Sequence, residues 1–288
     1  MKILLIGKTG QLGNDILKIA SKDFEVIAPS RNELDIAVQE SIYETINTIK
    51  PDVVINTAAF HNVPLCEIEY EQAFKINCIA VRELAILCKK QHSIFITFST
   101  DYVFDGQKRA PYNEDDCPMP LQVYGTSKLA GEFMALSNWP DKTIIIRTCG
   151  LYGLTGASSK GGNFVDKRIM DAKLNDYIEI SNDQIVCPTF TQDLANAVIS
   201  MIKQKINSGI YHLVNDGQCS WYDFTKEIYK LMKINVTLKS VDRKGLSGNM
   251  RRPLYSVLAN TKAKLMGISL FPWQNALERY INIKYLNK

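Results

Sequence analysis

The sequence lacks the residue patterns that usually build metal centres or disulfide frameworks. It contains only three histidines among 288 residues, and its seven cysteines are odd in number, scattered, and include no Cys-x-x-Cys pair. The histidines do not cluster with the cysteines along the chain. We therefore expect reduced thiols, no metal site and little role for metal catalysis.

Long apolar runs and blocks of like charge are also missing. No stretch approaches the roughly 20 apolar residues that a membrane span needs. Met1-Lys2 leads directly into a strand, without the apolar core and cleavage site of a leader peptide. The balance of 34 basic against 30 acidic residues gives a net charge of only +4. These features predict a cytoplasmic protein with neither a membrane nor a nucleic-acid partner.

What the sequence does contain is a glycine-rich turn directly after a short apolar run. Residues 2–6 read Lys-Ile-Leu-Leu-Ile, and Gly7, Gly10 and Gly13 follow before a helical pattern. Glycines three apart between a strand and a helix permit a tight turn and let a pyrophosphate approach the amides at the helix N-terminus. We therefore predict a dinucleotide site, although three glycines in seven residues also suit a simple turn.

The end of the second predicted strand, residues 24–28, bears on which dinucleotide is bound. NAD sites usually carry a carboxylate about 20 residues beyond the glycines, whereas an arginine there suits the 2′-phosphate of NADP. Ser30 and Arg31 stand at this point. The chain therefore favours NADPH, and a site that accepts either NADPH or NADH, with Arg31 solvated, stays open.

Apolar runs and helical patterns alternate through the first half of the chain. Strands are expected at 2–6, 24–28, 51–56, 93–98 and 144–147, with helices at 11–19, 39–49, 69–91 and 124–137 between them. This alternation predicts an α/β fold with a Rossmann-like, doubly wound parallel sheet.

The texture of the sequence changes after residue 150. A stretch rich in glycine and serine runs from Gly150 to Gly162. It suggests a dinucleotide-binding domain over residues 1–150 and a smaller substrate-binding α/β region over residues 151–288, with later segments crossing back to the first. In the second region we predict strands at 178–180 and 210–214 and helices at 193–203 and 221–232.

Three polar side chains form a candidate catalytic group. Thr100 follows the strand that ends at Phe98, and the carboxyl ends of parallel strands are where ligands bind. Tyr124 and Lys128 stand four apart on a predicted helix and so share one face. A nearby ammonium lowers the pKa of a phenol, and a hydroxyl can hold a carbonyl oxygen, so the group could transfer a proton to a ketone. A solvated Tyr–Lys pair is the alternative.

Four blocks in this order resemble the extended short-chain dehydrogenase/reductases. They are the glycine loop, residues 56–59 (Asn-Thr-Ala-Ala), residues 99–106 (Ser-Thr-Asp-Tyr-Val-Phe-Asp-Gly), and Tyr124-Gly125-x-x-Lys128. Within that superfamily the chain resembles the dTDP-4-dehydrorhamnose reductases over nearly its whole length. The blocks for this narrower likeness are residues 33–36, 163–165, 183–184, 188–189, 220–224 and 252–256.

The resemblance implies an NAD(P)H-dependent reduction of the 4-keto group of a dTDP-4-keto-6-deoxyhexose, dTDP-4-dehydro-L-rhamnose first among them. By this likeness Thr100, Tyr124 and Lys128 are catalytic, with Tyr124 as the proton donor. A nucleotide-sugar substrate follows, and a homodimer stays open. The implied cofactor-binding residues, beside Tyr124 and Lys128, are Gly7, Gly10, Gln11, Leu12, Gly13, Ser30, Arg31, Asp35, Ile36, Ala58 and Ala59. The implied substrate-binding residues are Val63, Thr100, Asp101, Tyr102, Asn163 and Arg252.

Some positions depart from the family pattern and leave the substrate open. His61 stands where the family has threonine, Pro64 where it has aspartate, and Cys149-Gly150 where an aromatic residue lines the sugar pocket. Either Leu151 or Tyr152 fills that gap, or the substrate is a different 4-keto nucleotide sugar. A non-catalytic NADP-binding regulatory subunit is a further alternative. Tyr102 after Asp101, instead of glutamate, argues against a dehydratase.

Overall fold

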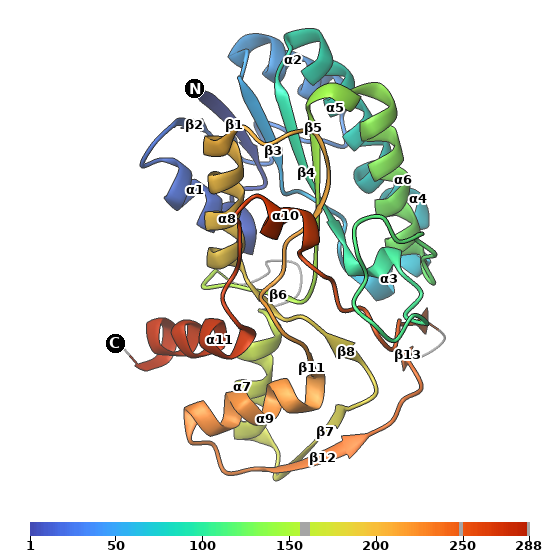
Figure 1. The fold of residues 1–288 in the computed structure, drawn as a ribbon, viewed down its shortest axis with the longest axis vertical. Coiled ribbons are helices and arrows are strands. Elements are labelled where there is room, and N and C mark those ends of the chain that lie inside the picture. Colours follow the sequence, from blue (N-terminus) through green and yellow to red (C-terminus); the bar gives the residue numbers. More distant parts are fainter. Residues whose placement is uncertain (156–161, 248–249, 287–288) are drawn as a thin grey trace.

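A computed structural model describes residues 1–155, 162–247 and 250–286 (Figure 1). Its upper part is built on a six-stranded sheet in the order β10-β5-β4-β3-β1-β2, and every pairing in it is parallel. The predicted fold class is confirmed. The strands are β1 (Lys2–Ile6), β2 (Glu25–Ile27), β3 (Val53–Asn56), β4 (Ile94–Thr100), β5 (Thr143–Thr148) and β10 (Gly209–His212).

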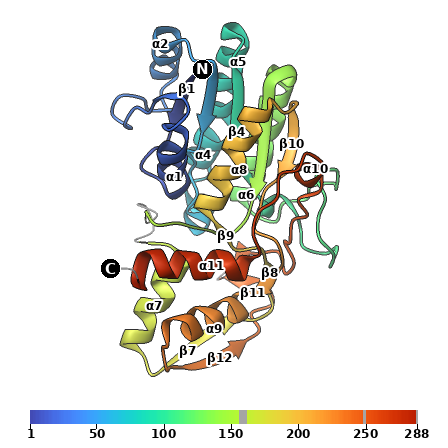
Figure 2. The same ribbon diagram turned by 60° about the vertical axis from the view of Figure 1, so that its left-hand side comes forward.

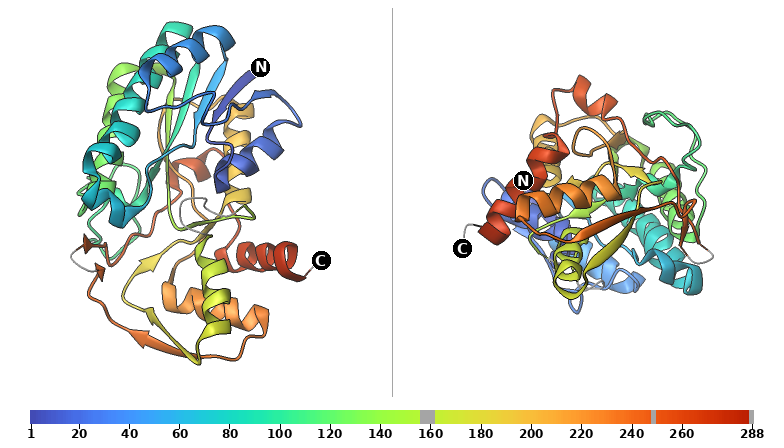
Figure 3. Two further views of the ribbon diagram at one scale, coloured as in Figure 1. Left: turned by 180° about the vertical axis from the view of Figure 1, so that it is seen from behind. Right: turned by 90° about the horizontal axis from the view of Figure 1, so that it is seen from below.

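Helices cover both faces of this sheet, which explains why its strands are apolar runs without alternation. Ile3 and Leu5 of β1 point into a core shared with α1 (Gln11–Ala20) and α8 (Thr191–Gln204), which lie side by side in Figure 2. Leu4 and Ile6 point into the opposite core. That core is closed by α2 (Gln39–Ile49), α5 (Ala80–Gln91) and α6 (Val123–Asn138), seen from behind in Figure 3.

The segment expected as one helix over residues 69–91 is broken in the structure. It consists of α4 (Tyr70–Phe74), a π-helical turn η1 (Lys75–Ile79) and α5, and it is preceded by α3 (Val63–Ile68), which the sequence did not predict. The π turn lies where α6 packs most closely: a Cβ on Gly131 would be 2.1 Å from the Asn77 carbonyl oxygen. The sequence reasoning took residues 69–91 as one continuous helix and did not find the extra residue that a π turn inserts into the helical repeat.

The lower part of the molecule has its own core, made largely of aromatic rings. Tyr152, Phe190, Phe224 and Tyr280 contact one another there. Helices α7 (Phe164–Leu174), α9 (Trp221–Met232) and α11 (Trp273–Ile281) surround these rings, and β7 (Tyr177–Ser181) pairs in parallel with β12 (Thr237–Val241). The remaining elements are η2 (Asp101–Val103), η3 (Pro140–Lys142), β6 (Leu151–Tyr152), β8 (Ile185–Val186), β9 (Thr189–Phe190), β11 (Cys219–Ser220), β13 (Leu246–Ser247), β14 (Met250–Arg251), α10 (Thr261–Leu265) and η5 (Asn282–Leu286).

The chain crosses between the two parts more than once. After residues 151–190 it returns to the sheet, where α8 packs on α1 and β10 pairs with β5. The Thr191 hydroxyl donates a hydrogen bond of 2.6 Å to Asp15, which ties α8 to α1. Residues 156–161 of the glycine- and serine-rich stretch lie outside the described residues. In the described parts of the chain, no helix has both the length and the apolar character needed to cross a bilayer.

Candidate active site

The glycine loop lies where the order of the strands reverses, between β1 and β3. Gly7 has a φ of +90°, and a Cβ there would be 2.5 Å from Thr57 Oγ1 and 3.0 Å from the amide nitrogen of Ala58. The Thr57 hydroxyl in turn donates a 2.7 Å hydrogen bond to the Ile6 carbonyl. The loops that follow β1 and β3 therefore contact each other, and only glycine fits at position 7. Open α/β sheets bind ligands at this kind of switch point.

The N-terminus of α1 faces the same place. Gly10 precedes the helix without any side-chain cap, and Gln11 Oε1 is buried without a hydrogen-bond partner among the described residues. A Cβ on Gly13 would be 2.2 Å from the Gly7 carbonyl oxygen, so that glycine brings helix and loop together. The Leu12 side chain lies in the hydrophobic core, which leaves only its backbone for a cofactor. Uncapped amides at a helix N-terminus suit a diphosphate.

The segment after β2 carries a carboxylate that the sequence reasoning passed over. Glu33 accepts a 2.6 Å hydrogen bond from the Ser30 amide, while Arg31 is exposed and lies 3.8 Å from Asp35. Asp35 also accepts a hydrogen bond from the Ala37 amide. The Ile36 side chain lies mostly in the core, so its backbone is the main part available to a cofactor. A cavity of about 440 Å³ adjoins this segment and is lined by Lys8, Ile27, Ala28, Pro29, Glu33, Glu44, Thr45, Thr48 and Ile49.

Ala58 and Ala59 follow β3, and Asn77 of the π turn hydrogen-bonds the backbone of the next residue, Phe60. Asn77 accepts a hydrogen bond from the Phe60 amide and donates one to the Phe60 carbonyl, each 2.9 Å long. Its amide also donates to Ser127 Oγ at 3.0 Å. This buried asparagine therefore has partners for both ends of its amide, and one side chain links the Ala58–Phe60 loop to α6.

Thr100 and Tyr124 meet at the carboxyl end of β4. The Thr100 hydroxyl hydrogen-bonds the Tyr124 phenol, which lies in the first turn of α6. The Tyr102 ring meets the Tyr124 ring edge-on, with 6.3 Å between centroids. The N-terminus of α6 is fixed from outside, because Glu67 on α3 accepts a 2.8 Å hydrogen bond from the Val123 amide. The two groups expected to bind one keto oxygen therefore lie together.

The expected lowering of the Tyr124 pKa is wrong for this structure. Burial raises the pKa of the phenol, and the hydrogen bond from Thr100 offsets only part of that effect. Lys128 lies on the same face of α6 and is itself buried, which lowers its pKa to about 8, while the negative charge of Glu132 acts in the opposite direction. The sequence argument counted the attraction between the two groups but not the loss of hydration that both undergo.

Glu132 belongs to a buried ion pair that the sequence reasoning did not find. Arg147 on β5 donates three hydrogen bonds of 2.6–3.2 Å to its carboxylate, and both side chains are about 2% exposed. The sequence did contain a signal for this pair. Arg147 directly follows the apolar run Ile144–Ile146 of a buried strand, so its charge requires a buried acidic partner. The pair joins the helix that carries Tyr124 and Lys128 to the sheet.

Asp101 is buried beside Thr100, with Oδ1 at 3.1 Å from Thr100 Oγ1 and Oδ2 at 3.1 Å from Cys149 Sγ. Asn163 is also buried. Its side chain accepts from the Asp166 amide and donates to the Gly153 carbonyl and the Tyr280 hydroxyl. The expectation that these two residues contact the substrate stays a prediction, and the structure shows the protein groups with which their side chains already hydrogen-bond.

Val63 and Arg252 belong to segments around the start of α6. Val63 opens α3, which packs against α6, and is half-buried. The positive charge of Arg252 acts on Tyr102 and lowers the pKa of that phenol, although burial dominates and raises it. Arg252 Nε is buried and has no partner among the described residues. Two of its properties, the charge and the free donor, are those of an anion-binding group.

The space beside Gly150 is filled by a residue 71 positions further along the chain. Gly150 has a φ of +54°, and a Cβ there would be 3.2 Å from a ring carbon of Trp221 and from the Cα of Pro188. Trp221 is half-buried and stacks on Phe164, with 4.5 Å between ring centroids. Tyr152, which was expected as one candidate for this place, is completely buried in the lower core. Trp221 therefore supplies the aromatic surface next to Gly150.

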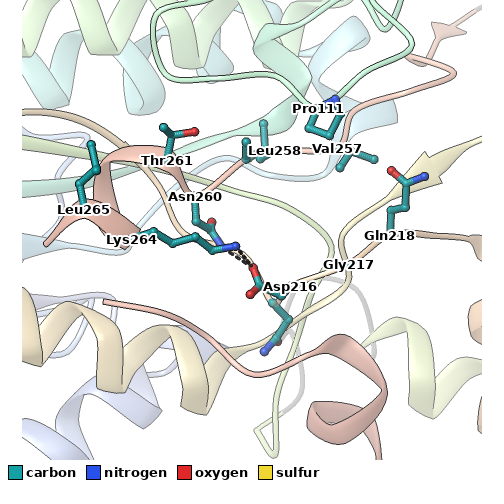
Figure 4. A pocket seen from close by; sticks show the side chains of 12 residues that line it. Pro111, Asp216, Gly217, Gln218, Val257, Leu258, Asn260, Thr261, Lys264 and Leu265 are labelled. Atoms are coloured by element: carbon teal, nitrogen blue, oxygen red, sulfur yellow. Dashed lines mark hydrogen bonds and ion pairs between the residues drawn. The ribbon is translucent and has the colours of Figure 1, made fainter. Parts of the chain in front are cut away.

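A second cavity, of about 540 Å³, contains none of the predicted site residues (Figure 4). It is bordered by the segment after β10 and by the start of α10, and an ion pair of 3.0 Å between Lys264 and Asp216 crosses it. The candidate active site is thus defined by the ends of β1, β3 and β4 and the N-terminus of α6.

Comparison with known proteins gives matches over the whole chain. The family model described as RmlD substrate binding domain matches residues 1–286. The spore coat polysaccharide biosynthesis protein SpsK of Bacillus subtilis is 36% identical, covering 97% of this chain and 96% of its own. The dTDP-4-dehydrorhamnose reductase of Aggregatibacter actinomycetemcomitans is 34% identical (96% and 97%), and the dTDP-4-keto-6-deoxy-D-glucose reductase of Streptomyces niveus is 31% identical (95% and 94%).

Solved structures agree with these sequence matches. A dTDP-4-dehydrorhamnose reductase from Clostridium acetobutylicum superposes with a TM-score of 0.93 at 38% identity and full coverage of both chains. The enzyme of the same name from Bacillus anthracis, solved in complex with NADP, has a TM-score of 0.91 at 30% identity, covering 97% of this chain and 98% of that one. The resemblance drawn from the sequence blocks is confirmed.

Proposed function

The chain belongs to the RmlD substrate-binding family, the family of the dTDP-4-dehydrorhamnose reductases, and we propose that it reduces the 4-keto group of dTDP-4-dehydro-L-rhamnose with NADPH. Membership of this family already implies an NADPH-dependent oxidoreductase that reduces a dTDP-linked sugar. The observation that supports the proposal best is the meeting of the Thr100 hydroxyl and the Tyr124 phenol at the carboxyl end of β4. A non-catalytic regulatory subunit would have no use for that pairing.

The residues around the glycine loop fit a dinucleotide. The uncapped N-terminus of α1 offers amide donors to a diphosphate, and the unpartnered Gln11 Oε1 is an acceptor available to the same ligand. Gly7 and Gly13 remove the side chains that would fill the turn. At the other end, the guanidinium of Arg31 suits the 2′-phosphate, while the Ser30 amide donates to Glu33. When bound, NADPH supplies the hydride for the keto carbon.

In this proposal Tyr124 gives its hydroxyl proton to the keto oxygen. Reduction requires a phenol that is protonated at working pH, and the burial that raises its pKa keeps it in that form. Thr100 holds the same oxygen by a hydrogen bond and so fixes its distance from the phenol. Lys128, on the same helix face, is placed to bind the ribose next to the nicotinamide and to stabilise the phenolate left after transfer.

The segments after residue 150 provide the nucleotide-sugar part of the site in this proposal. Arg252, with its free Nε donor, would bind the diphosphate, and Tyr102 and Val63 would border the sugar. Trp221 would provide the apolar surface beside Gly150. A different 4-keto nucleotide sugar is the second candidate, because the aromatic surface beside Gly150 comes from Trp221 on α9 and not from the residues that directly follow β5.

Steady-state turnover tests the proposal. The protein is incubated with NADPH and dTDP-4-dehydro-L-rhamnose, and nicotinamide absorbance is followed. We expect Tyr124→Phe to lower kcat by about 10²–10⁴-fold while the cofactor Kd stays within twofold, because only the proton donor is removed. Tyr211→Phe is the matched control, since its hydroxyl hydrogen-bonds the Asn207 carbonyl, away from the site.

Two results would contradict this assignment. If the protein reduces other 4-keto nucleotide sugars but not dTDP-4-dehydro-L-rhamnose, its substrate is the second candidate. If Tyr124→Phe and Tyr211→Phe lower kcat equally, the Tyr124 phenol is not the proton donor.

A further inference from the structure

Two aspartates in this protein are equally buried but have opposite surroundings. Asp101 is 4% exposed and Asp193 is 5% exposed. Asp193 lies 2.6 Å from the guanidinium of Arg279 and also accepts a hydrogen bond from Asn215. In the described part of the chain, the side chains that hydrogen-bond Asp101 are neutral, namely the Thr100 hydroxyl and the Cys149 thiol. A buried carboxylate without a cation is costly, so the two acids should differ in charge.

The hydrogen bonds available to the Thr100 hydroxyl also indicate that Asp101, unlike Asp193, is uncharged. A hydroxyl has one hydrogen to donate and two lone pairs to accept with. Thr100 Oγ1 lies 3.2 Å from the Tyr102 amide, which can only donate, and 3.1 Å from Asp101 Oδ1. An ionised Asp101 can only accept, and it would take the single Thr100 hydrogen. A protonated Asp101 would fill the second lone pair and leave that hydrogen for a third partner.

We propose that Asp101 carries a proton and is a positioning residue: it donates a hydrogen bond to Thr100 Oγ1, so that the Thr100 hydrogen points to Tyr124 and to the keto oxygen of the substrate. The Cys149 thiol donates to the other carboxyl oxygen and fixes which of the two carries the proton. The benefit to catalysis rests on the proposed function. The protonation state of Asp101 does not, and it can be measured without substrate.

The groups around Asp101 support this arrangement. Burial raises the pKa of its carboxyl, and its hydrogen-bonding neighbours offset that only in part. The titratable groups that face it are the phenols of Tyr102 and Tyr124 and the thiols of Cys149 and Cys187, and burial raises the pKa of each. Arg252 acts on the neighbouring Tyr102. At neutral pH these phenols and thiols are uncharged, so they provide no charge to stabilise an ionised Asp101.

Infrared difference spectroscopy tests the proton directly. The spectrum of the wild-type protein minus that of Asp101→Asn, at neutral pH and without ligands, should contain the C=O stretch of a protonated carboxyl. The matched spectrum for Asp193→Asn should contain the antisymmetric stretch of a carboxylate, because that acid forms an ion pair of 2.6 Å with Arg279. A carboxylate signal for Asp101 would overturn the proposal whatever the enzyme's substrate turns out to be.

Kinetics then test the positioning role. Asparagine can donate from one end and accept at the other, as the neutral acid does, so Asp101→Asn should lower kcat only about threefold. Asp101→Leu removes the donor and should lower kcat about a hundredfold with the KM for NADPH unchanged, the loss typical of one misdirected hydrogen bond to a reacting oxygen. Cofactor binding and thermal unfolding verify that both variants fold. If the two variants lose equal activity, Asp101 does not orient Thr100 in this way.

Discussion

Lys128 should make the protein less stable at neutral pH than it would be without that charge. Its ammonium is buried, and its pKa in the folded protein is about 8, against an ordinary value of 10.5. A difference of about 2.5 between the two pKa values corresponds to about 3 kcal/mol, at roughly 1.4 kcal/mol for each unit. The charged form is the disfavoured one in the folded state, so below pH 8 the folded protein bears this whole cost.

Replacing Lys128 with methionine removes the charge and keeps the length of the side chain. Glu132 does not lose its main partner, because Arg147 remains hydrogen-bonded to both of its oxygens. We therefore expect Lys128→Met to raise the free energy of unfolding by about 3 kcal/mol at pH 7 and to abolish turnover. A more stable but inactive protein would result, because the site needs a charge that the fold disfavours.

The stability cost of Lys128 should depend on pH, because the folded and unfolded proteins release its proton at different pH values. Between pH 8 and 10.5 the unfolded chain binds a proton at Lys128 that the folded protein has released, so wild-type stability rises with pH relative to the variant. Urea unfolding of both cofactor-free proteins at pH 7 and pH 10 should show the gap of about 3 kcal/mol closing to below about 1 kcal/mol. Lys89→Met, at an exposed lysine, should change stability by less than about 0.5 kcal/mol at either pH. A variant less stable than the wild type, or a gap that stays constant with pH, would refute the reasoning.

Three further changes probe the cofactor loop, the choice of cofactor and the wall of the sugar pocket. Gly13→Ala places a methyl group 2.2 Å from the Gly7 carbonyl, so it should cost about 3 kcal/mol in thermal unfolding and weaken NADPH binding. Arg31→Ala should lower kcat/KM for NADPH about tenfold and leave NADH unaffected, whereas Glu33→Gln should favour NADPH about threefold, because the Glu33 carboxylate occupies the Ser30 amide and repels a 2′-phosphate. Trp221→Ala should raise the KM for the nucleotide sugar about tenfold, with cofactor affinity in fluorescence titrations unchanged.

Much of the upper part of the molecule could be predicted because its signals are local. The strand at residues 2–6, the glycines after it and the helix at 39–49 are each encoded within a dozen residues, and the structure places them as expected. The i, i+4 spacing likewise put Tyr124 and Lys128 on one helix face. What the spacing could not supply was the hydration lost by both groups, which depends on everything packed around them.

The sequence could not supply contacts between residues far apart in the chain. Trp221 reaches Gly150 across 71 positions, and the Asn163 side chain, besides capping its own helix, donates to Tyr280 on α11. The family resemblance placed Asp101 among the substrate contacts and gave no information on its burial. Its burial against Cys149 arises only when β4 and β5 lie in register.

The return of the chain to the sheet through α8 and β10 has a consequence for any attempt to dissect the protein. A fragment that stops at residue 150 would leave the edge of β5 unpaired and expose the face of α1 that α8 covers. An open parallel edge and a bare apolar helix face both promote aggregation. We therefore expect the nucleotide half to be insoluble when expressed by itself, and insertions that change sugar preference to succeed only where they keep both crossings intact.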